Sequence, residues 1–173
     1  MDVEEFSALF ERFERSAFRV EARDRYDVDT EREQFAAFLE GKQLRPRTAD
    51  SDPWLALVAA GNREGRLIER VRIVSEPLTV YTRFEFAAYR DNIAAGEKVR
   101  VLPRAALASA DQSWATKDFW IFDETLFVLL SYDDNGRFLG VHQPNDIRPY
   151  LEAKQRALNL AVDFEEFVAE STP

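Results

Sequence analysis

Apolar residues recur with helical spacing in several segments of the chain. In the first segment, Phe6, Leu9, Phe10 and Phe13 fall at positions i, i+3, i+4 and i+7, on one face of a helix. Further helices are predicted in segments that repeat this spacing or have the length and position of a crossover helix. They cover residues 30–41, 53–65, 78–96 and 145–170.

Residues with capping chemistry stand at the expected starts of three of these helices. Thr30 and Glu33 have the spacing of a capping box. Asp52 precedes a proline, which suits an N-cap followed by the first helical position. Asn145 or Asp146 is the expected N-cap of the last and longest helix.

Between the helices, apolar and polar residues alternate with the period of two that is typical of strands. In the first such segment Phe18 and Val20 alternate with Arg19 and Glu21, which predicts a strand with one buried and one polar face. We expect strands in residues 17–24, 66–77, 97–103, 118–122, 125–133 and 137–143.

The segment 118–122 differs from the other strands because it is apolar on both faces. Phe119 and Ile121 would point to one side, and Trp120 and Phe122 to the other. This pattern predicts a central strand that is covered on both sides. Asp123 then fits the start of a turn.

The order of these elements predicts an α/β fold, with α+β as the alternative. We expect one domain over residues 1–173, with a mixed sheet that ends in a C-terminal antiparallel hairpin and is flanked by helices. The Asn-Gly pair at 135–136 is a strong signal for the turn of that hairpin. We expect residues 170–173 to form a disordered tail.

Composition argues against several classes of function for this chain. The net charge of −9 disfavours direct binding to nucleic acids and to anionic membranes, since both require a positive surface. There is no cysteine and only one histidine, so cysteine and histidine metal sites are not expected, and we predict no cofactor and no bound metal. No leader segment or long apolar run is present, so we expect a cytoplasmic protein.

Charged residues in and beside the strands are the candidates for ligand binding. Arg70 and Arg72 share one strand face; they either form ion pairs with nearby acids or bind an anion at the strand end, where Arg100 would join them. Asp118 and Asp123 would point to opposite faces of their strand. No catalytic residue is assigned. The candidate ligand-binding residues are Arg72, Glu76, Arg83, Arg100, Asp118 and Asp123.

Three segments carry a resemblance to a known family: RVRIVSEP at 70–77, AAGEKVRVLPR at 94–104 and DFWIFD at 118–123. Together they resemble a bacterial family called domain of unknown function 6879, over about Phe6 to Leu160. The resemblance implies no particular activity. It implies a regulatory setting, because members of that family resemble companions of helix-turn-helix regulators.

A second resemblance concerns the phospholipase D fold. A helix, the segment AGEKVRVLP, a loop and a strand that ends in Asp123 are similar to one half of that fold. The family motif His-x-Lys-x4-Asp would fall on Thr116, Asp118 and Asp123, so the nucleophile and the phosphate-binding cation are missing. This resemblance therefore implies a ligand-sensing domain without the catalytic residues.

These observations predict a non-catalytic regulatory domain that senses a small ligand or binds a protein, with a helix-turn-helix DNA-binding regulator as the expected partner. The apolar segment Phe164–Val168 is a candidate docking surface. One alternative is a metal-dependent enzyme acting on phosphoesters or nucleotides through Asp118, Asp123 and Arg72 with Mg²⁺. Another is an antitoxin or an immunity-like partner.

Overall fold

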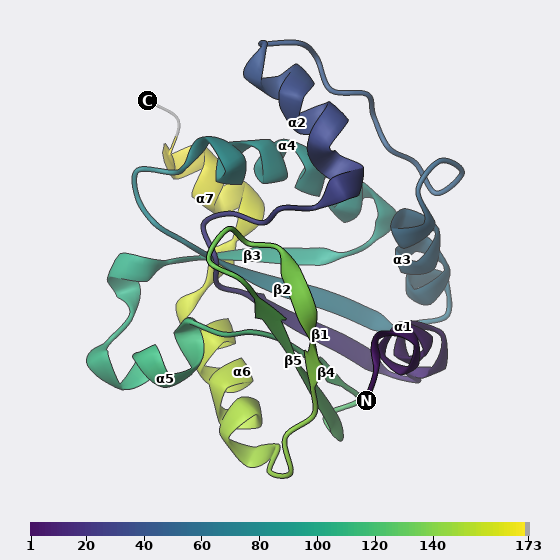
Figure 1. Cartoon of the computed structure of the whole chain (residues 1–173), viewed down its shortest axis with the longest axis vertical. Helices are drawn as coiled ribbons and strands as arrows, with labels where there is room; N and C mark the ends of the chain where they lie inside the picture. Colours follow the sequence, from purple (N-terminus) through teal and green to yellow (C-terminus); the bar gives the residue numbers. More distant parts are fainter. Residues whose placement is uncertain (172–173) are drawn as a thin grey trace.

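A seven-stranded mixed sheet forms the centre of the computed structural model, which describes residues 1–171 (Figure 1). The strand order is β6-β5-β4-β1-β2-β3-β7. The strands are β1 (Ser16–Glu21), β2 (Leu67–Val74), β3 (Lys98–Pro103), β4 (Asp118–Phe122), β5 (Leu126–Tyr132), β6 (Phe138–His142) and β7 (Val162–Asp163).

The sheet has a parallel and an antiparallel part. Strands β1, β2 and β3 are parallel to one another, whereas β4, β5 and β6 follow as an antiparallel region beside β1. The turn between β5 and β6 contains Gly136, with φ of 85°, and the Asp133 carboxylate accepts hydrogen bonds from the amides of Asn135 and Arg137. The predicted single α/β domain with a C-terminal antiparallel hairpin is therefore confirmed.

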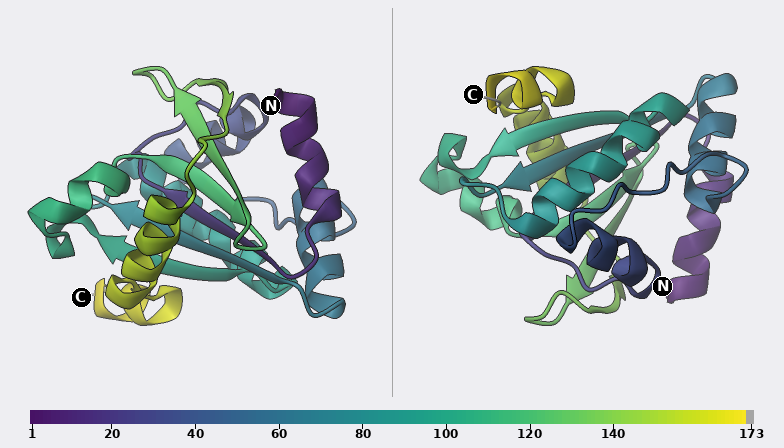
Figure 2. Two further views of the ribbon diagram at one scale, coloured as in Figure 1. Left: turned by 90° about the horizontal axis from the view of Figure 1, so that it is seen from below. Right: turned by 90° about the horizontal axis from the view of Figure 1, so that it is seen from above.

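Helices cover both faces of the sheet (Figures 1 and 2). On one face, α6 and the short α5 pack over the middle strands, and on the other face lie α1, α3 and α4. Helix α2 packs on the outer side of α4, and α7 packs against α4 beside β3. The α-helices are α1 (Val3–Arg12), α2 (Arg32–Leu39), α3 (Pro53–Arg63), α4 (Val80–Ala95), α5 (Gln112–Ala115), α6 (Arg148–Leu160) and α7 (Phe164–Ser171). Short 3₁₀ helices are η1 (Asp29–Glu31), η2 (Arg104–Ala106) and η3 (Ser109–Asp111).

Strand β4 lies inside the sheet and is buried along its whole length, as its apolar pattern predicts. Phe119 and Ile121 pack in the core beneath α6. Trp120 and Phe122 pack on the opposite face, in the core shared with α1 and α3. The two faces of this one strand therefore connect two of the hydrophobic clusters of the domain.

The predicted single helix over residues 145–170 is wrong. Helix α6 ends at Leu160, and Ala161 has an extended backbone with ψ of 144°. Val162 and Asp163 then pair with β3 as strand β7, and α7 begins at once. The break depends on tertiary structure. The short strand β7 supplies hydrogen-bond partners for backbone groups of β3, and the helical spacing of apolar residues does not predict that pairing.

The caps of the helices follow the sequence only in part. Asp52 caps α3, accepting hydrogen bonds from the amides of Trp54 and Leu55 as expected. The predicted capping box at Thr30 is wrong, since Thr30 lies inside η1 and α2 begins two residues later without a side-chain cap. Neither Asn145 nor Asp146 is the N-cap of α6, which is Ile147.

The polar face predicted for β1 is not exposed to solvent. Glu21 on that face is only 5% exposed, because α4 covers that side of the strand.

The predicted C-terminal tail begins inside a helix. Residues 170 and 171, assigned to the tail, belong to α7, and residues 172–173 lie outside the described part of the chain. None of the helices described is long and apolar enough to cross a lipid bilayer.

Candidate functional site

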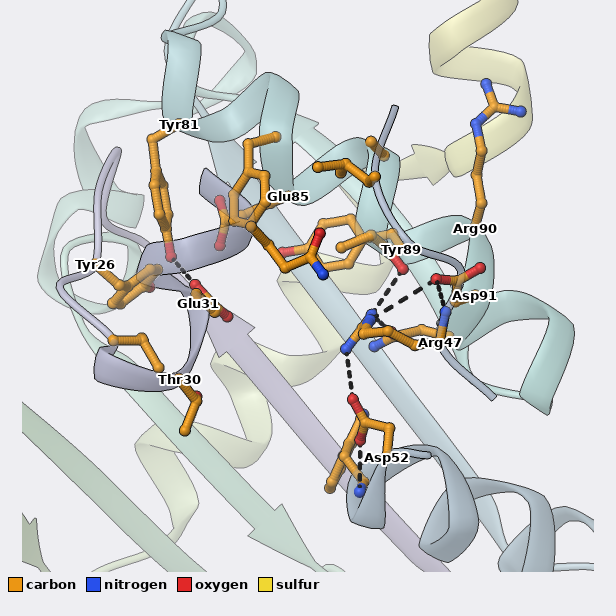
Figure 3. Close-up of a pocket in the computed structure, with 18 of the residues that line it drawn as sticks. Tyr26, Thr30, Glu31, Arg47, Asp52, Tyr81, Glu85, Tyr89, Arg90 and Asp91 are labelled. Carbon is orange, nitrogen blue, oxygen red and sulfur yellow. Dashed lines mark hydrogen bonds and ion pairs between the residues drawn. The ribbon is translucent and has the colours of Figure 1, made fainter. Parts of the chain in front are cut away.

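A pocket of about 950 Å³ lies on the face of the sheet that carries α3 and α4 (Figure 3). Its floor is formed by β1, β2 and β4, through Arg19, Glu21, Arg70 and Trp120. Helix α4 forms one wall. Helix α2 and the segment 42–47 close it from outside. Because strand side chains alternate, a single face of the sheet supplies all four floor residues.

Glu21 is the centre of the floor. Its carboxylate lies 2.8 Å from the guanidinium of Arg70 and 2.8 Å from that of Arg19. It also accepts a hydrogen bond of 2.7 Å from the hydroxyl of Tyr89, which comes from α4. The guanidinium of Arg19 stacks over Trp120, 5.3 Å from the ring centroid. Two strands and one helix thus meet at one carboxylate.

The network continues from Arg70 to the far end of α4. Arg70 donates through Nε to the Glu97 carboxylate at 2.6 Å, and this carboxylate also accepts from the side-chain amide of Asn92 at 2.7 Å. The indole of Trp54, from α3, donates to the same group at 3.0 Å. These contacts satisfy a carboxylate that is only 2% exposed.

A second buried pair joins the sheet to α4. Arg72 donates through Nε and Nη2 to Oε2 of Glu85, at 3.1 and 2.6 Å. Beside this pair the hydroxyl of Tyr26 donates to Asp118, which also accepts from the amide of Ala22 at 3.2 Å. Arg72 lies over the ring of Tyr26. Charged groups therefore extend beneath the whole pocket.

The wall beside α2 combines aromatic rings with a carboxylate. Tyr81 donates a hydrogen bond of 2.7 Å to Oε2 of Glu31, which lies at the end of η1 (Figure 3). The rings of Tyr26 and Tyr81 lie 6.3 Å apart between centroids, and that of Phe84 lies 5.9 Å from Tyr81. Tyr132 adds a ring 5.1 Å from that of Tyr26.

Arg47 holds the cover of the pocket in place. Its guanidinium donates to the side chains of Asp52 at 3.0 Å and Asn92 at 2.6 Å, and to the carbonyl of Ala88 at 2.9 Å. Its own amide donates to the carboxylate of Asp91 at 3.0 Å. One side chain therefore ties the segment between α2 and α3 to α4 and to the start of α3.

The carboxyl groups of the pocket differ in acidity. Burial opposes ionisation of Glu21, but Arg70 and Arg19 outweigh it and hold the pKa of Glu21 below its usual range. At Glu85 burial prevails over the opposing effect of Arg72 and raises the pKa to about 8. Burial likewise raises the pKa of Glu31 and of Asp118.

The residues singled out from the sequence do not form one site. Arg72 and Asp118 lie beneath the pocket, where each has protein partners. Glu76 and Arg83 are exposed and do not line the pocket. Arg100 does not join Arg72: it pairs in register with Val71, on the α6 face of the sheet, and contacts Glu69 at 3.2 Å.

Asp118 and Asp123 are separated as their spacing predicts. The carboxylate of Asp123 accepts hydrogen bonds from the amides of Glu14, Arg15 and Ser16, at 2.8, 2.7 and 2.9 Å. It orders the loop before β1 and lies outside the pocket. Among residues 1–171 no group of three or more His, Cys, Asp or Glu side chains is arranged to hold a metal ion.

Sequence reasoning missed most residues that line the pocket. The pattern predicts that Arg19 and Glu21 lie on a polar strand face, and it predicts no role for Arg47, which also lines the pocket. A signal was present: Arg19 and Glu21 on one face of β1 pair in register with Arg70 and Arg72 of β2. Charged residues of both signs on the matching faces of neighbouring strands indicate a buried network when helices cover that face.

The apolar end of the chain is also placed differently from the prediction. Phe164 and Phe167 are 1% and 5% exposed and pack against Phe86 of α4. These side chains complete the core beside β3, so they do not form the predicted docking surface.

A comparison of the sequence with known protein families gives one family. No curated protein matches the sequence. The comparisons lend no support to the resemblance to the phospholipase D fold. Residues 4–169 match the family described as Domain of unknown function (DUF6879), and the chain therefore belongs to that family.

Proposed function

We propose that this domain is a non-catalytic ligand sensor that binds a small organic molecule in the pocket between the sheet, α2 and α4, and reports its presence to a protein partner. The pocket itself is the observation that carries the proposal. Its volume of about 950 Å³ is in the range of small-molecule sites, and it combines aromatic walls with a few convergent polar groups.

The floor of the pocket supports a binding role rather than a catalytic one. Glu21 and Arg70 satisfy each other within the floor network. A candidate base or nucleophile needs a free group facing the bound molecule, and a hydrogen-bonded partner that activates it. The floor carboxylates instead hold strands and helix together, which favours a rigid base for recognition.

The cover of the pocket supports a signalling role. None of the residues of α2 is fully buried, so this helix is attached to α4 through partly buried rings such as Phe35 and Phe38. Segments with few buried contacts open at low cost in free energy. On the outer surface of α2, Leu39 is 60% exposed. A ligand that fixes α2 would therefore change a surface that a partner can contact.

The proposed partner is a DNA-binding regulator of the helix-turn-helix class. The net charge of −9 suits a basic protein better than DNA itself. The family resemblance noted from the sequence points to the same regulatory setting. Binding through a partner would let the pocket control transcription without direct contact with nucleic acid.

A thermal-shift screen of small metabolites tests the ligand half of the proposal. The variant Ala88→Phe places a ring in the pocket, since Ala88 lines it from α4. The matched control is Ala94→Phe, on the exposed side of the same helix. A true pocket ligand raises the midpoint of unfolding of wild type and of the control, but not of Ala88→Phe. Ligands that stabilise all three proteins equally would argue against this pocket.

A pull-down from the native host tests the partner half. We expect a stoichiometric helix-turn-helix protein whose retention changes when the ligand is added. Equal retention with and without a pocket ligand would contradict sensing, and recovery of no DNA-binding protein would contradict the proposed partner.

A further inference from the structure

The buried charged network beneath the pocket, taken together with Glu31, contains more carboxyl groups than cations. Within the described chain, this network and Glu31 comprise three arginines and five carboxyl groups. They are Arg19, Arg70 and Arg72, against Glu21, Glu31, Glu85, Glu97 and Asp118. Arg47 does not correct this excess, since it pairs with Asp52 and Asp91 at the rim.

The other cations near the pocket lie at its edge. Lys42 and Arg45 are exposed and pair with Glu40 and Glu33 outside the pocket. Arg90 on α4 is exposed, and the half-buried Arg23 lies over the ring of Tyr132 and donates to the carbonyl of Asp133 at 2.7 Å. Exposed cations at this distance are screened by water and salt, so they compensate buried carboxylates weakly.

Glu31 is the carboxylate that lacks a cation. Across residues 1–171 it forms no ion pair, and its hydrogen bond comes from the neutral hydroxyl of Tyr81, to Oε2. Glu85, one helical turn after Tyr81, uses only Oε2 for Arg72. Both glutamates line the pocket, and the negative charge of Glu31 helps to raise the pKa of Glu85. An oxygen of each is therefore free to accept a bond from a ligand.

Aromatic rings surround these two carboxylates. Tyr26, Tyr81 and Tyr132 line the same end of the pocket, with Phe84 beside Tyr81. The faces of aromatic rings attract ammonium groups, and the attraction grows where water is excluded. Rings and carboxylates at one end of a pocket form the environment that binds organic cations.

We propose that the pocket recognises an organic cation, an ammonium group carried on an apolar body, with the charge held between Glu31 and Glu85. This inference rests on the proposed ligand-binding function and names the chemical class of the ligand. The apolar body would lie toward Trp54 and Trp120, whose rings contact each other in another part of the pocket. The raised pKa values of Glu31 and Glu85 accord with an unmet demand for positive charge.

Three probes of similar shape and different charge test the proposal: phenethylamine, phenethyl alcohol and hydrocinnamate. Binding is measured by calorimetry, and its place is found from amide NMR shifts in η1, α2 and α4. We expect the amine to bind about tenfold more tightly than the alcohol, the ratio of one charged hydrogen bond. We expect the anion to bind least.

The variant Glu31→Gln isolates the charge because it keeps the size of the side chain. It should weaken binding of the amine about tenfold and leave the alcohol unchanged. The matched control is Glu33→Gln, in the first turn of α2, whose exposed side chain lies outside the pocket lining. That control should bind all three probes like wild type.

The outcomes separate this inference from the proposed function. If the alcohol or the anion binds in the pocket as tightly as the amine, or if Glu31→Gln keeps the preference for the amine, the cation proposal is wrong and ligand binding stands. If no probe binds while the metabolite screen finds a ligand that Ala88→Phe blocks, the cation proposal is likewise wrong. If that screen also finds nothing, both proposals fail.

Discussion

The carboxylate of Glu21 on β1 and the guanidinium of Arg70 on β2 lie 2.8 Å apart on the floor of the pocket, where both residues are buried. Arg19 and the hydroxyl of Tyr89 complete the surroundings of that carboxylate. An ion pair in this position costs desolvation free energy that its own attraction offsets only when the geometry is good. Loss of one member of this buried pair should therefore destabilise the domain more than loss of one member of an exposed ion pair.

Replacing Glu21 by Gln should destabilise the domain by about 3–5 kcal/mol, because two arginines lose their shared counter-charge in a buried place. The free energy of unfolding in urea measures the effect. The control is Glu69→Gln on β2, whose partner Arg100 is 37% exposed and can be hydrated. That change should cost less than about 1 kcal/mol. Equal costs for the two variants would contradict a central role for Glu21.

The stability of the domain should fall as the pH rises from about 4.5 to about 8. Glu85 has a pKa of about 8 in the folded protein against an ordinary value of 4.5, so the folded state binds more protons in this range. Proton release then favours the unfolded chain. The raised pKa values of Glu31 and Asp118 act in the same direction. Glu21, with a lowered pKa, changes its contribution only below 4.5.

The variant Glu85→Gln should remove a large part of this pH dependence, since the amide cannot titrate. Free energies of unfolding measured across the range test it, with the exposed Glu33→Gln as the control that keeps the wild-type slope. A wild-type curve that rises with pH over this range would show that Arg72 keeps Glu85 ionised in the folded state.

Arg47 should control the mobility of the pocket cover. Replacing Arg47 by Met removes its hydrogen bonds to Asp52, Asn92 and the carbonyl of Ala88, while the apolar stem remains. Amide hydrogen exchange should become at least about tenfold faster in residues 42–52 and in α2, the effect of losing about 1.4 kcal/mol of local stability. The exchange of β4 should not change.

The matched control for Arg47 is Arg45→Met. Arg45 is exposed and pairs with the exposed Glu33. Such surface pairs contribute little, so this variant should exchange like wild type. If both variants speed exchange equally, the cover is held by the segment as a whole and not by Arg47.

Asp123 should matter for stability and not for ligand binding. Asp123→Ala removes the acceptor for three backbone amides, at an expected cost of about 1–3 kcal/mol. Asp123→Asn should cost less, because an amide oxygen still accepts and asparagine tolerates the positive φ of 51°. Denaturant unfolding measures both. Loss of affinity for a pocket ligand in the folded Asp123→Asn protein would place this residue in a site after all.

The local pattern of apolar and polar residues predicted the fold correctly where the residues of one element are enough to show which of its faces must be buried. The apolar run at 118–122 was sufficient to predict a central strand, since every side chain in it requires cover. Arg70 and Arg72 were placed on one face by the alternation of strand residues alone. The pattern failed for Arg100, because its face depends on the register between β2 and β3, which pairs it with Val71.

The sequence by itself determined the α/β class, the covered strand and the hairpin, because hydrophobic periodicity and turn chemistry act within short segments. Tertiary structure alone decided the break between α6 and α7 and the pocket. The break needs the edge of β3 as a hydrogen-bonding partner. The pocket needs Glu21, Arg70 and Tyr89 from three separate elements, and Arg47 from a segment of linker-like composition. Burial of such groups is favourable only when all their partners arrive together, and no local pattern records that condition.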